Sequence, residues 1–168
     1  MKYQIIDNFL DHVTFHKIQK DMVANLDWYY SDSVAFSHDN KDYYFTHNFM
    51  DQEILQQPTS KWYPNIMSPI LDRLDKLNMP VRSLIRAKGN MYPSTQEILQ
   101  HEFHKDYPFE HKGGLYYVNT CNGYTILDDD TKIESVGNRL LLFDASKKHA
   151  SSTCTDKKVR ININFNYF

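Results

Sequence analysis

The N-terminal part of the chain combines short extended segments with apolar residues at helical spacing. Residues 3–7 (YQIID) and 43–50 (YYFTHNFM) are rich in β-branched and aromatic side chains, so both predict strands. Between them, residues 11–26 predict an amphipathic helix. Its apolar residues recur on one helical face, at Phe15, Ile18, Met22 and Leu26.

A second helical region is expected over residues 60–78. In the segment SPILDRLDKLN, Ser68 suits the N-cap position and Pro69 the first helical position, where its missing N–H costs nothing. Apolar residues then follow at helical spacing, at Ile70, Leu71, Leu74 and Leu77.

From residue 81 onward the apolar period changes to two, which is typical of strands. Strand-like segments cover residues 81–92, 113–120, 132–136, 139–145 and 159–168. Turns are predicted between them, at Asn122-Gly123 as a hairpin, at residues 128–131 and at Gly137-Asn138. Two helices followed by many short strands predict an α+β fold, with the helices packed on one face of a β-sandwich or jelly-roll barrel.

The last strand alternates strictly between apolar and polar side chains. Its apolar face carries Ile161, Ile163 and Phe165, and its polar face carries Arg160, Asn162, Asn164 and Asn166. A surface strand would turn the polar face to water. If the apolar face packs against the helices, the polar face instead lines the barrel interior, which is costly unless it binds something polar.

Composition and charge narrow the class of protein. The chain has 168 residues with 41% hydrophobic and 14% aromatic content, which fits one domain with a substantial core. The formal net charge of −2 provides no general field for binding DNA, RNA or an anionic membrane. Two cysteines are too few for a disulfide framework, and no segment resembles a signal peptide or a membrane span. We therefore expect a cytoplasmic protein without nucleic-acid or membrane partners.

The segment HEFHKD, residues 101–106, indicates a metal site. On a strand, His104 and Asp106 would point to the same face, and His149, after the strand over residues 139–145, could supply a third ligand. Two histidines and one carboxylate leave one side of an ion open, which suits non-haem Fe(II). His101 and His111 are interpreted as surface or second-shell residues. Four further histidines show no partner spacing, namely His12, His16, His38 and His47.

Arg160 follows His149 by 11 residues on the last strand. With H-x-D upstream, this pattern resembles the Fe(II)- and 2-oxoglutarate-dependent dioxygenases, in particular the prolyl 4-hydroxylase-like branch. The specific motifs cover about residues 81–168. The resemblance implies a double-stranded β-helix (jelly-roll, cupin-like) core over residues 81–168, with helical support mainly from residues 8–78, in a single domain spanning residues 1–168.

The resemblance also implies roles for individual residues. His104, Asp106 and His149 would bind Fe(II), with no other catalytic residue required. Arg160 would bind the far carboxylate of 2-oxoglutarate, because a guanidinium matches a carboxylate bidentately. The segment LYYVN supplies Tyr117 for the same carboxylate.

Further positions are candidates for the pocket around these residues. The segment NMYP supplies Tyr92, which would bind 2-oxoglutarate or the substrate or else pack in the core. Side chains expected at the substrate or in the second shell are Asn90, Asn119, Asn162 and Asn166. Arg86 and Lys88 are interpreted as plain surface, although they could shape the substrate mouth. Residues 93–100 are a candidate lid.

The activity implied is hydroxylation, with O2 consumed, 2-oxoglutarate converted to succinate and CO2, and ascorbate as a candidate reductant. Asp106 favours hydroxylation, because related halogenases replace this carboxylate with a small residue. Related nucleic-acid demethylases carry a second arginine where this chain has Asn166, which counts against a nucleic-acid substrate. Peptidyl proline, a free amino acid and another small metabolite remain alternatives.

Two other functions are compatible with the ligand set. A jelly-roll module could hold a metal without catalysis, but it has no need for Arg160 and Tyr117. A zinc hydrolase could use the same ligands. Its general base would be Glu102, which strand parity points away from His104.

Overall fold

The computed structural model describes residues 3–34, 43–51 and 59–168. Its first helix is α1 (His12–Lys20), continued by a π-helical turn (Asp21–Asn25), and its second is α2 (Tyr63–Lys76). The strands are β1 (Tyr3–Ile6), β2 (Tyr29–Ser31), β3 (Tyr44–Asp51), β4 (Leu84–Pro93), β5 (Lys112–Tyr117), β6 (Tyr124–Ile126), β7 (Lys132–Glu134), β8 (Arg139–Asp144), β9 (Ala150–Ser151) and β10 (Val159–Tyr167).

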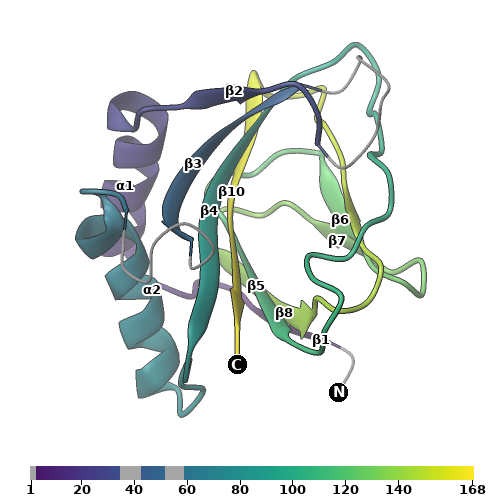
Figure 1. Ribbon diagram of the computed structural model, residues 1–168. Helices are drawn as coiled ribbons and strands as arrows, with labels where there is room; N and C mark the ends of the chain where they lie inside the picture. The colour runs from purple at the N-terminus through teal and green to yellow at the C-terminus, as the bar shows by residue number, and fades with distance from the viewer. Residues whose placement is uncertain (1–2, 35–42, 52–58) are drawn as a thin grey trace.

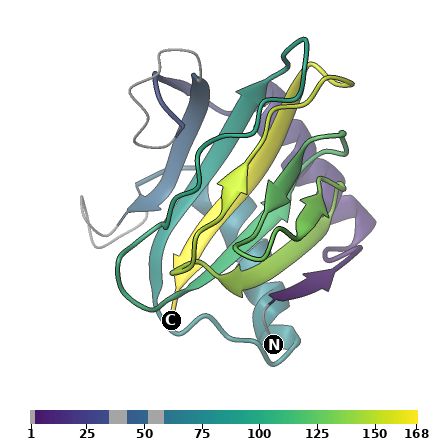
Figure 2. The ribbon, with the colours of Figure 1, turned by 90° about the vertical axis from the view of Figure 1, so that its right-hand side faces the viewer.

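The strands form two antiparallel sheets. The larger sheet has the order β1-β8-β5-β10-β4-β3-β2, and the smaller has the order β7-β6-β9. Both helices cover the outer face of the larger sheet, while the smaller sheet faces its other side (Figure 1). Figure 2 looks onto the smaller sheet, with the helices behind. The predicted α+β jelly-roll with helices on one sheet is therefore confirmed.

Strand β10 lies in the middle of the larger sheet, where it pairs with β4 and β5. Its apolar residues Ile161, Ile163 and Phe165 are fully buried in the main hydrophobic cluster. That cluster also contains the buried face of α2, represented by Ile66 and Ile70. The apolar face of the last strand thus packs toward the helices, as the alternation predicts.

The polar face of β10 is buried as well. Arg160, Asn162, Asn164 and Asn166 are at most 9% exposed. Since they alternate with the residues that face the helices, they point into the space between the two sheets. The interior is therefore polar along the length of β10.

The second helix lies within the expected region, residues 60–78, but it starts before the predicted N-cap at Ser68. It begins at Tyr63, with Pro64 in its first turn, so Ser68 lies inside the helix rather than at its N-cap and Pro69 is internal. The reason is packing, because Ile66 and Met67 belong to the buried stripe of α2 together with Ile70 and Leu74. Burial of this longer stripe outweighs the proline signal.

The hairpin predicted at Asn122-Gly123 does not form. No glycine in the described ranges has positive φ, and the chain crosses here from β5 in one sheet to β6 in the other. The Asn122 side chain instead hydrogen-bonds with Thr155, donating to its hydroxyl and accepting from its backbone N–H.

The other two turns are confirmed. Asp130 adopts φ 63° in the connection from β6 to β7, and Asn138 adopts φ 64° before β8. Asn138 also uses its amide to bond both the N–H and the carbonyl of Leu10. No helix in the described part of the chain is long and apolar enough to cross a membrane.

Truncating Ile163 to alanine should lower the free energy of unfolding by about 2–5 kcal/mol, because a cavity opens between β10 and the helices. Urea unfolding measures the loss. Val13→Ala is the control, since Val13 is 77% exposed on α1 and should change stability by under about 0.5 kcal/mol. Equal effects of the two variants would contradict the assigned packing.

Candidate metal centre and the pocket behind it

Three side chains from distant parts of the sequence converge at one end of the polar interior. His104, Asp106 and His149 each offer one ligand atom, and these atoms lie within 4.8 Å of one another. The Nε2 atom of His104 is 4.0 Å from Asp106 Oδ1, and the Nε2 atom of His149 is 3.7 Å from Asp106 Oδ2. The three residues predicted as metal ligands are thus brought together.

The backbone fixes both histidines. His104 and His149 form an isolated antiparallel bridge, with N–H···O distances of 2.9 Å in both directions. This bridge replaces the regular strand that the sequence suggested around H-x-D. Nδ1 of His104 lies 3.2 Å from the carbonyl of Glu102, and Nδ1 of His149 lies 3.0 Å from that of Lys147. A carbonyl only accepts, so Nδ1 carries the proton and the Nε2 lone pairs are left for a metal.

Asp106 is held by donors from β4 and β10. Its Oδ1 accepts from Arg86 Nη2 at 3.1 Å, and its Oδ2 accepts from the amides of Asn166 at 2.8 Å and Asn164 at 3.3 Å. Burial would raise the pKa of Asp106, but the charges of His149 and Arg86 and the bond from Asn166 lower it to about 2. The carboxylate is therefore ionised at neutral pH and fixed in orientation.

Arg86 is a residue whose role sequence reasoning missed. It was interpreted as surface, yet its side chain is only 19% exposed and forms the ion pair with Asp106. Its guanidinium also donates to Asn166 Oδ1 at 3.2 Å and lies 5.2 Å from the Tyr107 ring. The one available signal was its parity with the inward residues of β4.

The surroundings of His104 favour the neutral form of its imidazole. Burial lowers its pKa most, and the nearby charge of His149 lowers it further, while Asp106 opposes both effects. A neutral imidazole has a lone pair to give to a metal. Two imidazoles and one carboxylate are a donor set that suits a divalent transition metal.

Arg160 lies fully buried on the same inner face of β10. Its Nη2 donates to the Thr125 hydroxyl at 2.9 Å and its Nη1 to the carbonyl of Ser152 at 3.3 Å. Its Nε has no hydrogen-bond partner among the described residues, and no carboxylate there pairs with it. A buried cation with unused donors fits a site for an external carboxylate.

Two tyrosines enclose this guanidinium. Its carbon lies 5.5 Å from the centre of the Tyr92 ring and 5.7 Å from that of Tyr117. The Tyr117 hydroxyl donates to Thr125 Oγ1 at 3.0 Å, and burial raises the pKa of Tyr117, so its phenol keeps its proton. Thr125, which sequence reasoning did not single out, therefore accepts from both Arg160 and Tyr117.

Gly123 is required by the close approach of Arg160. A Cβ atom at position 123 would lie 2.7 Å from Arg160 Cδ and 2.6 Å from the Thr153 carbonyl oxygen. Both contacts are far inside van der Waals distance, and one is with the backbone. Gly123, which the sequence suggested as a hairpin residue, is thus needed to leave room for the Arg160 side chain.

Tyr92 and His101 form the wall next to Arg160. Tyr92 is buried, its ring stacks on Tyr44 at 5.5 Å and 10°, and burial raises its pKa to about 12. His101 packs on Tyr92 at 5.2 Å and is only 3% exposed, so the surface alternative for it is wrong. His111 is likewise buried. Burial, with help from the charge of Arg160, lowers the pKa of His101 to about 4.

The predicted asparagines occupy three different environments. Asn90 donates to Asn162 Oδ1 at 3.0 Å across β4 and β10, and Asn166 binds Asp106 as described above. Asn119 donates to the carbonyl of Val159 and accepts from the N–H of Ile161, on either side of Arg160. Asn119 thus holds the backbone that carries Arg160.

The candidate lid is fastened to the chain before β10. Thr95 N–H donates to the Cys154 carbonyl, and the backbones of Leu99 and Thr153 are joined through the Thr153 N–H. The hydroxyls of Thr95 and Thr153 lie 2.6 Å apart. These bonds would have to break for residues 93–100 to open as a lid.

The remaining histidines lie outside the cluster in the described ranges. His12 and His16 face each other on α1, with Nε2 atoms 2.9 Å apart. His47 is bonded to the Asp27 carbonyl and to the Ser60 hydroxyl. His38 lies outside the described residues.

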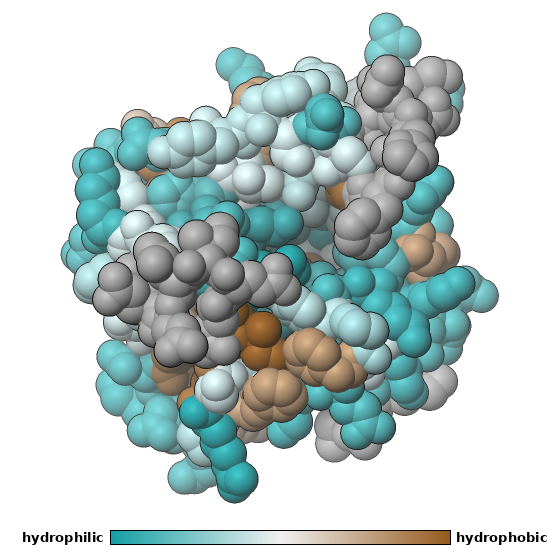
Figure 3. Space-filling view, in the orientation of Figure 1, coloured by the Kyte–Doolittle hydropathy of each residue, from teal (hydrophilic) through white to brown (hydrophobic). Residues whose placement is uncertain are grey.

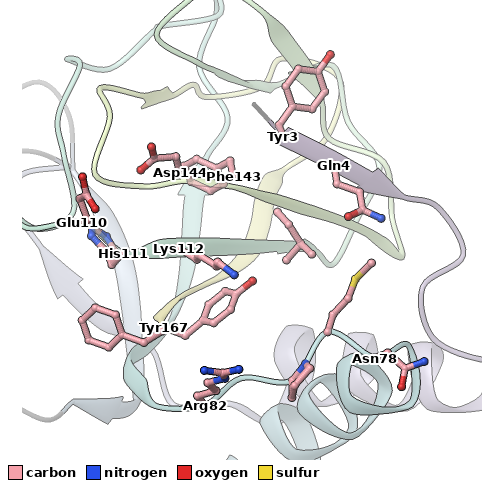
Figure 4. Close-up of a pocket in the computed structure, with 14 residues that line it drawn as sticks. Tyr3, Gln4, Asn78, Arg82, Glu110, His111, Lys112, Phe143, Asp144 and Tyr167 are labelled. Carbon is pink, nitrogen blue, oxygen red and sulfur yellow. The ribbon is translucent and has the colours of Figure 1, made fainter. Parts of the chain in front are cut away.

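A groove of about 990 Å³, shown in Figure 4, is not lined by the proposed metal ligands or by Arg160. It is lined by residues from the ends of α2, β1, β5, β8 and β10, and includes none of the predicted site residues. Lys112, Asp144 and Tyr167 line it from the helix-facing side of the sheet, and Phe143, whose ring centre lies 4.9 Å from that of His149, lines it from the inner side. Figure 3 shows one face of the whole molecule, and the apolar side chains on that face gather in the lower half of the picture.

Comparisons with known proteins agree on the fold. No family model matches the chain, and no curated protein does. A Trichoplax adhaerens prolyl hydroxylase, solved with a hypoxia inducible factor peptide fragment, has a TM-score of 0.66 at 19% identity, over 99% of this chain and 83% of that one. A Pseudomonas putida prolyl-4-hydroxylase has a TM-score of 0.63 at 10% identity, over 99% of this chain and 92% of that one. A 2OG-Fe(II) oxygenase family oxidoreductase from Burkholderia pseudomallei has a TM-score of 0.67 at 9% identity, over 99% of this chain and 84% of that one.

The fold is therefore that of the 2-oxoglutarate- and Fe(II)-dependent oxygenases. Among the structures it is similar to, prolyl hydroxylases recur. The resemblance stated from the motifs is thus confirmed for the fold.

The pKa of His101 predicts how stability depends on pH. In the folded protein it lies near 4, below the ordinary value of 6.5, so the unfolded chain takes up a proton first as the pH falls. Stability of the metal-free protein should therefore decrease between about pH 6.5 and about pH 4. His101→Gln should reduce that decrease by about 1–3 kcal/mol.

Urea unfolding at about pH 7 and about pH 4.5 measures this difference. His16→Gln, at an exposed position of α1, is the matched control and should follow the wild type. If His101→Gln also follows the wild type at both values, burial does not set the protonation of this ring.

Proposed function

We propose that this protein is an Fe(II)- and 2-oxoglutarate-dependent dioxygenase that hydroxylates an organic substrate. One observation carries the proposal. An ionised carboxylate and two imidazoles converge on a single point, and a buried arginine without a carboxylate partner among the described residues lies on the same inner face. The first feature suits iron and the second suits a dicarboxylate co-substrate.

His104, Asp106 and His149 would hold the iron from one side. When bound, the iron and 2-oxoglutarate supply the oxidative chemistry that hydroxylates a C–H bond and releases succinate and CO2. Arg86, Asn164 and Asn166 keep the Asp106 carboxylate ionised and aimed at the metal position. Ascorbate is the candidate reductant that keeps iron divalent.

Arg160 would bind the far carboxylate of 2-oxoglutarate. Its Nε, which has no hydrogen-bond partner in the described ranges, supports this role, as do the phenols of Tyr117 and Tyr92 beside it. The Tyr117 hydroxyl would turn from Thr125 to the carboxylate or donate through Thr125. Asn90 and Asn162 line the interior between Arg160 and the metal cluster, and the chain would act as a single domain over residues 1–168.

The two rival functions have less support. A hydrolase needs a general base near the metal, and Glu102 is exposed and is not part of the ligand cluster. A metal-binding module without catalysis leaves the buried cation Arg160 without purpose. The likeness to prolyl hydroxylases and other oxygenases supports C–H hydroxylation as the reaction class.

Anaerobic addition of Fe(II) and 2-oxoglutarate should produce the weak visible charge-transfer band of an iron-chelated keto acid. His104→Ala and Asp106→Ala should abolish it, because each removes a ligand. Arg160→Lys should raise the half-saturating 2-oxoglutarate concentration about tenfold or more, because an ammonium lacks the bidentate fork.

Arg82→Ala is the matched control, since Arg82 is an exposed arginine before β4, and its band should equal that of the wild type. Unchanged thermal unfolding shows that each variant is folded. No band in folded wild type carrying one equivalent of iron would refute the dioxygenase proposal.

A further inference from the structure

Lys88 points into the same interior as the metal ligands. It lies on β4 between the inward residues Arg86 and Asn90, and its side chain is partly buried. Its ammonium donates to the Tyr44 hydroxyl at 3.1 Å and lies 5.4 Å from the centre of that ring. The expectation that Lys88 is plain surface is therefore wrong.

Lys88 is close to the metal position. It stands opposite Asn164 in the pairing of β4 with β10, and Asn164 donates to the metal-binding carboxylate of Asp106. Sheet register thus places Lys88 on the same inner face as the metal cluster, next to a residue that contacts it.

The inner cations differ in their counter-ions. Arg86 pairs with Asp106 at 3.1 Å. Among the described residues Arg160 has hydroxyl and carbonyl partners alone, and it is proposed above to bind the far carboxylate of 2-oxoglutarate. Within the part of the chain that the structure describes, Lys88 bonds to a phenol alone, and no carboxylate lies within ion-pair distance of it. A partly buried ammonium without a counter-ion favours binding of an anion.

Tyr44 completes a site for such an anion. Its oxygen accepts the bond from Lys88, so its own phenol proton remains available as a donor. Its ring stacks on Tyr92, whose other neighbour is Arg160. One continuous aromatic surface therefore runs from the arginine to the lysine, with a cation over each end.

We propose that Lys88 and Tyr44 form a second carboxylate site, which binds a carboxylate of the substrate beside the metal. The substrate class is then a carboxylate-bearing molecule such as a free amino acid, rather than a neutral residue within a peptide. This inference rests on the proposed dioxygenase function. The carboxylate next to the keto group of 2-oxoglutarate is the other possible source of the same chemistry.

Benzoate and benzamide are suitable probes, because they share ring and size and differ in charge. Each is titrated at constant ionic strength into anaerobic protein loaded with Fe(II) and saturating 2-oxoglutarate. Binding is measured by the shift in Tm and by perturbation of the charge-transfer band. Wild type should bind benzoate about tenfold more tightly than benzamide, as expected for a charge-assisted contact.

Lys88→Gln should remove this preference while leaving the band and its 2-oxoglutarate dependence unchanged. Lys88→Arg should keep part of the preference. Lys112→Gln, an exposed lysine on the helix-facing side of β5, is the matched control and should bind as the wild type does.

Three results would overturn the inference. The first is equal binding of benzoate and benzamide by the wild type. The second is weaker binding of 2-oxoglutarate by Lys88→Gln. The third is a fall in benzoate binding as the concentration of 2-oxoglutarate rises. The second result assigns Lys88 to the co-substrate, and the third places benzoate at Arg160. Absence of the charge-transfer band in the wild type is a different outcome, because it refutes the dioxygenase function itself and not the role of Lys88.

Discussion

The polar inner face of β10 has to be satisfied by hydrogen bonds, and the arrangement of the interior follows from this constraint. A buried amide or guanidinium without partners costs several kcal/mol, on the order of a large part of a domain's stability. Partners come from three neighbouring parts of the chain, while Arg160 Nε and Asn164 Oδ1 have none among the described residues. Arg160 bonds to Thr125 of the smaller sheet, Asn162 to Asn90 of β4, and Asn164 and Asn166 to Asp106 of the long connection before β5. The central strand of the larger sheet thereby also orients the Asp106 carboxylate, which is proposed to bind the metal.

Sequence reasoning succeeded where one residue type had one physical explanation. The alternation in β10 could be interpreted because its apolar half needed a core and its polar half needed partners. His104, Asp106, His149 and Arg160 could be named because a known motif joins them. The structure brings the three proposed ligands together and leaves Arg160 without a carboxylate among the described residues. Their roles stay predictions until iron and 2-oxoglutarate are added.

Sequence reasoning failed where the deciding contact was distant. Nothing near Arg86 in the chain indicates Asp106, which reaches it only because the connection before β5 folds back over β4. Ser68 and Pro69 gave a sound local signal for a helix start, but the buried stripe of α2 begins at Ile66. Lys88 looks like solvated surface in the sequence and becomes informative only when the structure shows no carboxylate partner for it among the described residues. Long-range packing and ion pairing are the terms that local propensity omits.

Gly123 illustrates how the identity of a small residue can encode the shape of a distant site. Its φ is not positive, so backbone conformation does not demand glycine there. The demand comes from the stem of Arg160 and from the Thr153 carbonyl oxygen, which both lie where any side chain would begin. A larger residue at this position would therefore press on the arginine and on the backbone of the neighbouring loop together. In a survey of tolerated substitutions, position 123 would then report on the proposed affinity for a dicarboxylate as well as on the stability of the loop that contains it.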